Sequence, residues 1–131
     1  GGDGCPTVVD IPETGGFFYG DTTGFVADFD ESCDYGGAPK GGASDQILRL
    51  VLTQNRRVLL DMNGSTYSTL LSLRQGPTCP GVELKGACNF AFSGPRSFLD
   101  EELTAGTYFI VIDGYNSAKG PWDLDVRVIP P

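Results

Sequence analysis

The chain contains no histidine, and this absence excludes several kinds of active site. Histidine is the general base of serine and cysteine relays and the usual nitrogen ligand of catalytic zinc. Neither arrangement can be built from this sequence. No other nucleophile stands beside an obvious base, so we expect the protein not to be an enzyme.

Positive charge is scarce, and long apolar runs are missing. Nine lysines and arginines stand against 17 aspartates and glutamates, which gives a formal net charge of −8. Such a chain repels phosphate backbones and anionic lipid, so nucleic acid is not an expected partner. No run of 18 apolar residues exists, and membrane insertion is not expected either. The start, GGDGCPTVVD, has no initiator methionine and no signal-peptide pattern, which favours a processed product or an excerpt of a longer chain.

Glycine and proline, by contrast, are abundant. The 131 residues include 19 glycines and 9 prolines, and β-branched and aromatic residues fill the intervals between them. This composition is typical of short strands joined by tight turns. The length fits a single domain, residues 1–131, with a core of ordinary size.

Alternation of apolar and polar residues predicts the strands. In 45–53, Leu48, Leu50 and Leu52 share one face, and in 122–129 the residues Trp122, Leu124, Val126 and Val128 do the same. The run 107–113 is apolar throughout, as in a central strand that is covered on both faces. Further strands are predicted at 7–11, 17–19, 57–62, 69–74, 89–92 and 97–103. About eight strands predict an all-β, two-sheet antiparallel β-sandwich of jelly-roll-like form.

Turn signals complete this interpretation. Asn63-Gly64 favours a type I′ turn, so a hairpin is predicted between 57–62 and 69–74. The segment 76–86 is predicted to be a loop closed by a disulfide. The long stretch 21–40 is rich in aspartate and poor in aliphatic residues, which indicates a surface loop.

The four cysteines, Cys5, Cys33, Cys79 and Cys88, favour disulfides. Their spacings do not match the paired C-x2-C knuckles of a structural zinc site, and they lie in glycine- and proline-rich surroundings. Disulfides indicate an oxidising, extracellular location. Pairing of Cys79 with Cys88 and of Cys5 with Cys33 closes the shortest loops, but three connectivities are possible. Reduced thiols in a cytosolic protein are the alternative.

Several stretches together resemble a known family. Residues 97–114 contain the series L-T-A-G-T-Y, an apolar strand and D-G, and residues 120–126 follow with GPWDLDV. Upstream, 45–50 (DQILRL) and 67–73 (YSTLLSL) complete the pattern. This series resembles the bacterial pre-peptidase C-terminal domain over about residues 17–129, with 1–16 left as an N-terminal extension or first strand. The chain departs from the family pattern at Ser68 and at Asn89-Phe90, where acidic residues are usual.

The resemblance implies a β-sandwich of a secreted or surface protein. Members of that family act as non-catalytic accessory, binding or structural modules, some of them with calcium. We therefore expect an extracellular module with a structural or binding role, whose partner is a protein or carbohydrate at the cell surface. The alternative is a self-assembling subunit of an extracellular filament or surface coat, built by strand addition between neighbouring copies.

Three short motifs are candidate sites. Asp28, Asp30, Glu31 and Asp34 offer the oxygen ligands that calcium prefers, although a solvated acidic loop has the same composition. Asn63-Gly64-Ser65 is an N-glycosylation sequon, although the Asn-Gly pair also serves the turn by itself. The aromatic segment Phe17, Phe18 and Tyr19 is expected to pack in the core, with an exposed assembly strand as the alternative.

Overall fold

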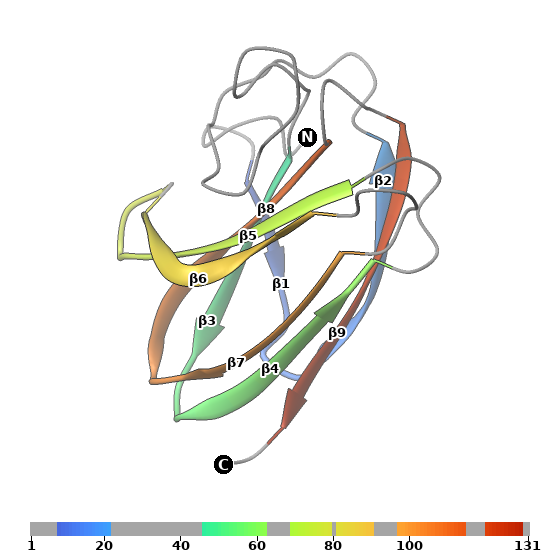
Figure 1. Ribbon diagram of the computed structural model, residues 1–131. Coiled ribbons are helices and arrows are strands. Elements are labelled where there is room, and N and C mark those ends of the chain that lie inside the picture. Colours follow the sequence, from blue (N-terminus) through green and yellow to red (C-terminus); the bar gives the residue numbers. More distant parts are fainter. Residues whose placement is uncertain are drawn as a thin grey trace.

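The computed structural model describes residues 8–21, 46–62, 69–79, 81–90, 97–114 and 120–129, and all of its regular elements are strands. There are nine strands in these segments (Figure 1), which have the following bounds. They are β1 (Val9–Ile11), β2 (Gly15–Asp21), β3 (Gln46–Leu52), β4 (Arg56–Asp61), β5 (Thr69–Gln75), β6 (Val82–Phe90), β7 (Phe98–Leu103), β8 (Gly106–Gly114) and β9 (Pro121–Ile129).

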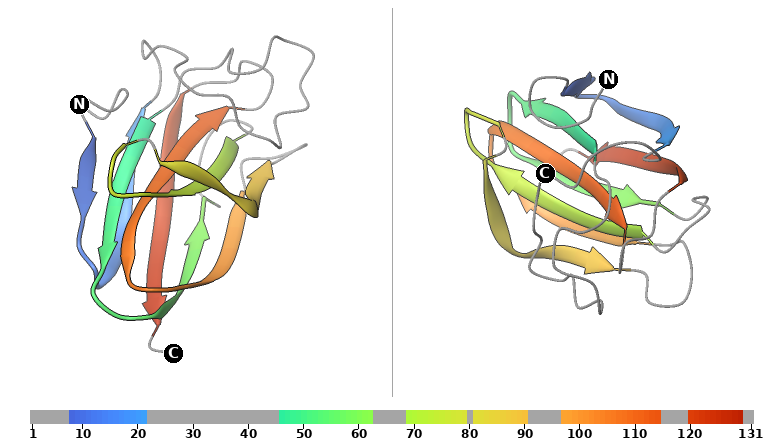
Figure 2. Two further views of the ribbon diagram at one scale, coloured as in Figure 1. Left: turned by 90° about the vertical axis from the view of Figure 1, so that its left-hand side faces the viewer. Right: turned by 90° about the horizontal axis from the view of Figure 1, so that it is seen from above.

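Two sheets pack face to face (Figures 1 and 2). The five-stranded sheet has the order β1-β3-β8-β5-β6, and the four-stranded sheet has the order β2-β9-β4-β7. From β2 to β9 all pairings are antiparallel, and the chain crosses repeatedly between the sheets. This strand order is that of a jelly roll. The predicted all-β sandwich is therefore confirmed.

β1 departs from the predicted antiparallel arrangement. It lies parallel to β3, with Val9 opposite Leu48 and Ile11 opposite Leu50. Because β1 and β2 are joined by a tight turn but enter different sheets, β1 extends the edge of the five-stranded sheet (Figure 2). A two-point ion pair fastens it, since the Arg49 guanidinium donates to both carboxylate oxygens of Asp10. This hydrogen bond also lowers the pKa of Asp10.

The predicted hairpin between 57–62 and 69–74 is wrong. β4 pairs with β7 and β9, whereas β5 pairs with β6 and β8, so the two strands belong to different sheets. An Asn-Gly pair favours a turn but does not dictate that its flanking strands pair with one another. The predicted loop 76–86 is also too long, because β6 already begins at Val82 and forms a hairpin with β5.

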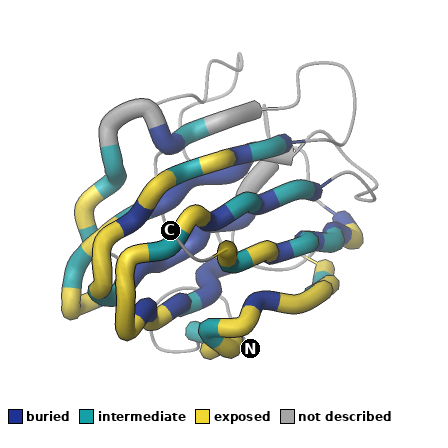
Figure 3. The backbone as a smooth tube through the Cα atoms, turned by 90° about the horizontal axis from the view of Figure 1, so that it is seen from below, coloured by how far each residue is buried: buried dark blue, intermediate teal, exposed yellow. Residues whose placement is uncertain are grey.

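The core lies between the two sheets. Leu48, Leu50 and Leu52 face it from β3, and Trp122, Leu124 and Val126 face it from β9, all at most 3% exposed. Buried residues alternate with half-buried or exposed ones along β9 and, from Leu48 on, along β3. Figure 3 shows such changes between buried and exposed positions along the strands of the sandwich. The period-2 pattern therefore identified the buried faces of both strands correctly.

A second apolar cluster covers the outer face of the five-stranded sheet. Ile47, Phe109 and Val111 are fully buried there, and Val8 and Cys79 pack against them. β8 lies between β3 and β5 and is buried on both faces. This confirms the prediction, made from its unbroken apolar run, that 107–113 is a central strand.

The turn between β7 and β8 explains the L-T-A-G-T-Y series. Gly106 has a φ of 155°, a conformation that other residues rarely adopt. The Tyr108 ring is buried, and its hydroxyl donates to the Thr104 carbonyl oxygen at 2.8 Å. The series therefore has a structural role, in which the tyrosine ties the start of a central strand back to the turn before it.

Gly15 offers a sharp test of how β2 docks on β9. Its φ is 80°, and a Cβ placed there would lie 2.3 Å from the Val126 carbonyl oxygen. Gly15→Ala is expected to lower the free energy of unfolding by about 3 kcal/mol, because both the backbone conformation and the close approach must relax. Urea denaturation followed by circular dichroism measures the effect.

Gly16→Ala is the matched control for this substitution. Gly16 also has a positive φ, 144°, so both alanine variants strain the backbone, but a Cβ at Gly16 would meet only the Phe18 ring, at 3.3 Å, and a side chain can move aside. A cost for Gly15→Ala no larger than that of Gly16→Ala would contradict the close docking of β2 on β9.

Candidate functional site

Most of the residues predicted as sites lie outside the described segments. This applies to the acidic set Asp28, Asp30, Glu31 and Asp34, to Asn63, and to Cys5 and Cys33. The calcium site and the glycosylation site remain predictions. A rise in melting temperature in millimolar calcium relative to chelator would support the first, and intact mass before and after glycosidase treatment would test the second.

Cys79 and Cys88 are described, and both are disulfide-bonded. Cys79 lies in the turn before β6 and packs on the outer cluster of the five-stranded sheet, while Cys88 lies on β6 opposite Ser72. The pairing of Cys79 with Cys88 and of Cys5 with Cys33 stays a prediction, because the second of these pairs lies outside the described residues. Peptide mapping without reductant would identify the pairs.

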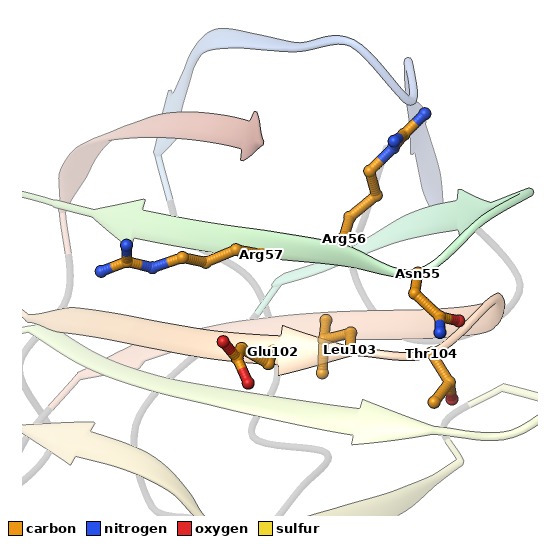
Figure 4. Close-up of a pocket in the computed structure, with 6 residues that line it drawn as sticks. All are labelled: Asn55, Arg56, Arg57, Glu102, Leu103 and Thr104. Carbon is orange, nitrogen blue, oxygen red and sulfur yellow. The ribbon is translucent and has the colours of Figure 1, made fainter. Parts of the chain in front are cut away.

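One hollow opens at the end of the sandwich where the turns β3–β4 and β7–β8 meet. It has a volume of about 390 Å³ and is lined by Asn55, Arg56, Arg57, Glu102, Leu103 and Thr104 (Figure 4). Asn55 has a structural task, because its side-chain oxygen accepts the Ala105 amide at 3.1 Å and so joins the two turns. Arg56 and Arg57 extend in different directions (Figure 4).

Arg57, one of the two arginines that line this end hollow, is engaged by a carboxylate. The Arg57 guanidinium is held by two hydrogen bonds to the Asp100 carboxylate, at 2.8 and 2.6 Å. The same bonds lower the pKa of Asp100 and raise that of Arg57. The lining contains one carboxylate, Glu102, and one hydroxyl, that of Thr104, which lies 3.3 Å from the Tyr108 hydroxyl.

The outer face of the four-stranded sheet carries a different arrangement. In the strand register, Phe17 lies opposite Asp125, Asp125 opposite Asp61, and Asp61 opposite Phe98. These residues form a row across all four strands, with an aromatic side chain at each end and two aspartates between them. In the next row Tyr19 lies opposite Asp123. We call these six residues the aromatic–acidic face.

The aromatic side chains of β2 are largely exposed. Phe17 is 61% and Tyr19 is 79% exposed, whereas Phe18 faces inward and packs against the core. The expectation that this segment packs in the core is therefore wrong for Phe17 and Tyr19. Successive side chains of a strand point to opposite faces, and here Phe17 and Tyr19 point to the outer face of the four-stranded sheet, whereas Phe18 points to the core.

Asp61 and Asp125 lie directly opposite each other on β4 and β9, so two acidic residues are neighbours on this face. Like charges directly opposite each other on neighbouring strands repel, and here they lie on the two inner strands of the sheet. Arg127 lies 3.5 Å from Asp125 and offsets part of this repulsion. A hollow of about 190 Å³ opens at this point, lined by Leu59, Asp61, Phe98, Asp125 and Arg127.

The aromatic–acidic face presents carboxylates and aromatic rings. Ionised carboxylates only accept hydrogen bonds, so a ligand must supply hydroxyl, amide or ammonium donors. Exposed aromatic rings attract cations and flat apolar groups. Within the described segments, no three acidic or cysteine side chains are grouped so that they could hold a metal ion.

Glu101 lies on β7, the strand at the opposite edge of the four-stranded sheet. It lies on β7 between Leu99 and Leu103, both buried, and so points toward the interior side. Burial, and to a lesser degree the charge of Asp100, raises the pKa of this carboxyl. The folded state thus binds a proton at Glu101 more readily than the unfolded chain does. The stability contribution of this group is largest at acid pH and falls as the pH rises through its pKa.

Glu101→Gln is therefore expected to raise the melting temperature at pH 7 and to leave it unchanged at pH 3, where the wild-type side chain is protonated. Thermal melts at both pH values measure this. Glu102→Gln, which removes a charge from the exposed face of the same strand, should change the melting temperature less. Equal melting temperatures of wild type and Glu101→Gln at pH 7 would contradict the inward placement.

The sequence could not identify this face. Alternation in 122–129 places Asp123 and Asp125 on the outward side, but their neighbours Phe17 and Asp61 are distant in sequence. Only the strand order and register bring them together. The sequence of β2 did indicate that Phe17 and Tyr19 lie on one side of the strand and Phe18 on the other, because side chains alternate along a strand.

Comparison with solved structures places the fold. The chain is similar to the pre-peptidase C-terminal domain of collagenase from Bacillus anthracis, with a TM-score of 0.61 and 11% identity over 92% of this chain and 95% of that one. It is also similar to Aeromonas hydrophila PliG, a periplasmic lysozyme inhibitor of g-type lysozyme, with a TM-score of 0.56 and 13% identity over 93% and 97% of the two chains.

No protein-family model matches the sequence, and no curated protein matches it significantly. At such low identity the structural likeness shows the fold alone. At that level it confirms the resemblance to the pre-peptidase C-terminal domain that the motifs indicated. Among the described residues, no helix is long and apolar enough to cross a membrane.

Proposed function

We propose that this chain is a non-catalytic, extracellular accessory module that binds a protein or carbohydrate through its aromatic–acidic face. The exposure of Phe17 and Tyr19 carries the proposal, because two large aromatic side chains on one sheet face are costly to leave in water without a use. Both proteins compared above share this fold, and the name of the first identifies it as a domain of a larger enzyme. That relation supports an accessory role here.

The absence of histidine supports a role without catalysis. The disulfide-bonded state of Cys79 and Cys88 supports an extracellular location.

A retention assay tests the proposal. Purified chain is mixed with insoluble cellulose, chitin, peptidoglycan and fibrillar collagen, and both bound protein and released soluble fragments are measured. We expect retention on at least one polymer without release of fragments. Replacing Phe17 and Tyr19 together by serine should weaken retention by about tenfold or more. Val82→Ser, at a site 75% exposed on the far edge of the other sheet, is the matched control.

Two results would overturn the proposed function. One is wild-type retention on none of the polymers, and the other is equal retention of the double serine variant. Release of soluble fragments would instead show an enzyme.

The open edge of β2 favours a second candidate, a subunit of a filament or coat that assembles with copies of itself. The net charge of −8 opposes it, because each added copy brings more negative charge. Light scattering and negative-stain images over a range of concentrations, in calcium and in chelator, distinguish ordered polymers from monomers.

A further inference from the structure

The four edge strands of this sandwich differ in how they are protected from pairing with a further strand. An edge strand presents unpaired backbone groups, and proteins usually protect it with a short strand, an irregular register or an inward-pointing charge. β1 is only three residues long, and the pairing of β6 with β5 shifts register between Ser72 and Arg74. β7 carries the inward-pointing Glu101. Each of these three edges therefore has one of the usual protections.

Within the described residues, the β2 edge shows neither a very short strand nor an inward-pointing charge. The strand is seven residues long, and within the described residues it pairs on one side only, with β9, in continuous register from Gly15 to Asp21. Its inward side carries Phe18 and two glycines, without a charge. Gly15 and Gly16 have positive φ, so the regular extended part is Phe17–Asp21. This part can pair with a further strand.

The side chains beside this edge specify the chemistry of such a strand. Residues of an added strand that lie opposite Phe17 and Tyr19 would meet aromatic rings, which favour a lysine or arginine over them. Beyond these rings lie Asp125 and Asp123, directly opposite on β9. Long basic side chains can cross the rings and reach toward these carboxylates.

We infer that the open edge of β2 binds an extended, lysine- or arginine-bearing segment of another protein, which pairs with Phe17–Asp21 through main-chain hydrogen bonds. This inference rests on the proposed function and names the class of partner. A second copy of this chain fits less well, because it carries the same net charge of −8.

A capped seven-residue peptide of alternating lysine and valine is the probe. Isothermal titration calorimetry with the whole chain should show binding that weakens with salt. The same peptide with alternate backbone nitrogens methylated keeps its charges but loses amide donors, and it should bind about tenfold more weakly or worse. A glutamate–valine peptide should not bind. Hydrogen exchange should slow at β2 amides and stay unchanged at β7 amides.

Variants locate the contact. Replacing Phe17 and Tyr19 by serine, or Asp123 and Asp125 by asparagine, should each weaken the lysine–valine peptide by about tenfold. Val82→Ser, on the edge strand of the other sheet, should bind as the wild type does. The substituted side chains are exposed or lie on the outer face, and circular dichroism melts confirm that each variant is folded.

The peptide-binding results test the inference separately from the proposed function, which the retention assay tests. Equal binding of the methylated peptide would show a contact by charge alone, which overturns strand addition and leaves the proposed function standing. Absence of binding, or equal binding of the glutamate–valine peptide, overturns the basic partner. Polymers that form through β2 in place of peptide binding would show that copies of the chain occupy the edge, and would overturn the inference as well.

Discussion

Trp122→Ala is expected to lower the free energy of unfolding by about 4 kcal/mol. The indole is only 3% exposed, and it packs over Gly20, where an added Cβ would lie 2.8 Å from the ring. Its Nε1 donates to the Gln46 side-chain oxygen at 3.1 Å, a buried contact between the two sheets. Alanine removes both the packing and this hydrogen bond.

Trp122→Phe is the matched control for this prediction. It keeps most of the ring volume and removes the donor, so a cost of about 1–2 kcal/mol is expected. Urea denaturation must be followed by circular dichroism, because Trp122 is the only tryptophan and its fluorescence is lost in both variants. A cost below about 1 kcal/mol for the alanine variant would contradict the packing of the Trp122 indole between the sheets.

Phe109→Ala is the second large effect, and it tests the outer cluster of the five-stranded sheet. Phe109 is fully buried on the side of β8 that faces away from the main core. Truncation is expected to cost about 3–5 kcal/mol, because the cavity forms in a covered cluster and not at a surface. Chemical denaturation measures this cost.

Val51→Ala is the comparison for this site. Val51 lies on the same outer side of the neighbouring strand β3, but it is 47% exposed. Its truncation should change stability by less than about 0.5 kcal/mol. Similar costs for the two substitutions would show that the outer face is not a second core.

The sequence predicted correctly those strands in which the order of apolar and polar residues itself shows which side is buried. The alternation in β3 and β9 and the unbroken apolar run of β8 correspond to the observed faces, because a strand with a period of two reports its own burial. The motif series that ends at Tyr108 indicated the correct fold. It encodes a turn, the start of a central strand and the hydrogen bond from the Tyr108 hydroxyl that joins the two.

The partners of each strand could not be predicted. The Asn63-Gly64 signal suggested that β4 and β5 pair, whereas the jelly-roll order places them in different sheets. The aromatic–acidic face was missed for the same reason, because its rows depend on which strands are neighbours. The exposure of Phe17 and Tyr19 could not be foreseen without knowing that β2 lies at an edge.

The partnership of β2 with β9 has a consequence for how the protein reaches its folded state. These strands lie near opposite ends of the described chain, with Gly15 opposite Arg127 and Asp21 opposite Pro121. Loops of such length make the closing contact slow, and folding times of milliseconds to seconds are expected for this topology. During synthesis β2 must wait for almost the whole chain to emerge before its partner exists. Of the nine described strands, β2 therefore waits longest for a partner strand, and Phe17, Phe18 and Tyr19 stay without their neighbours on β9 during that interval.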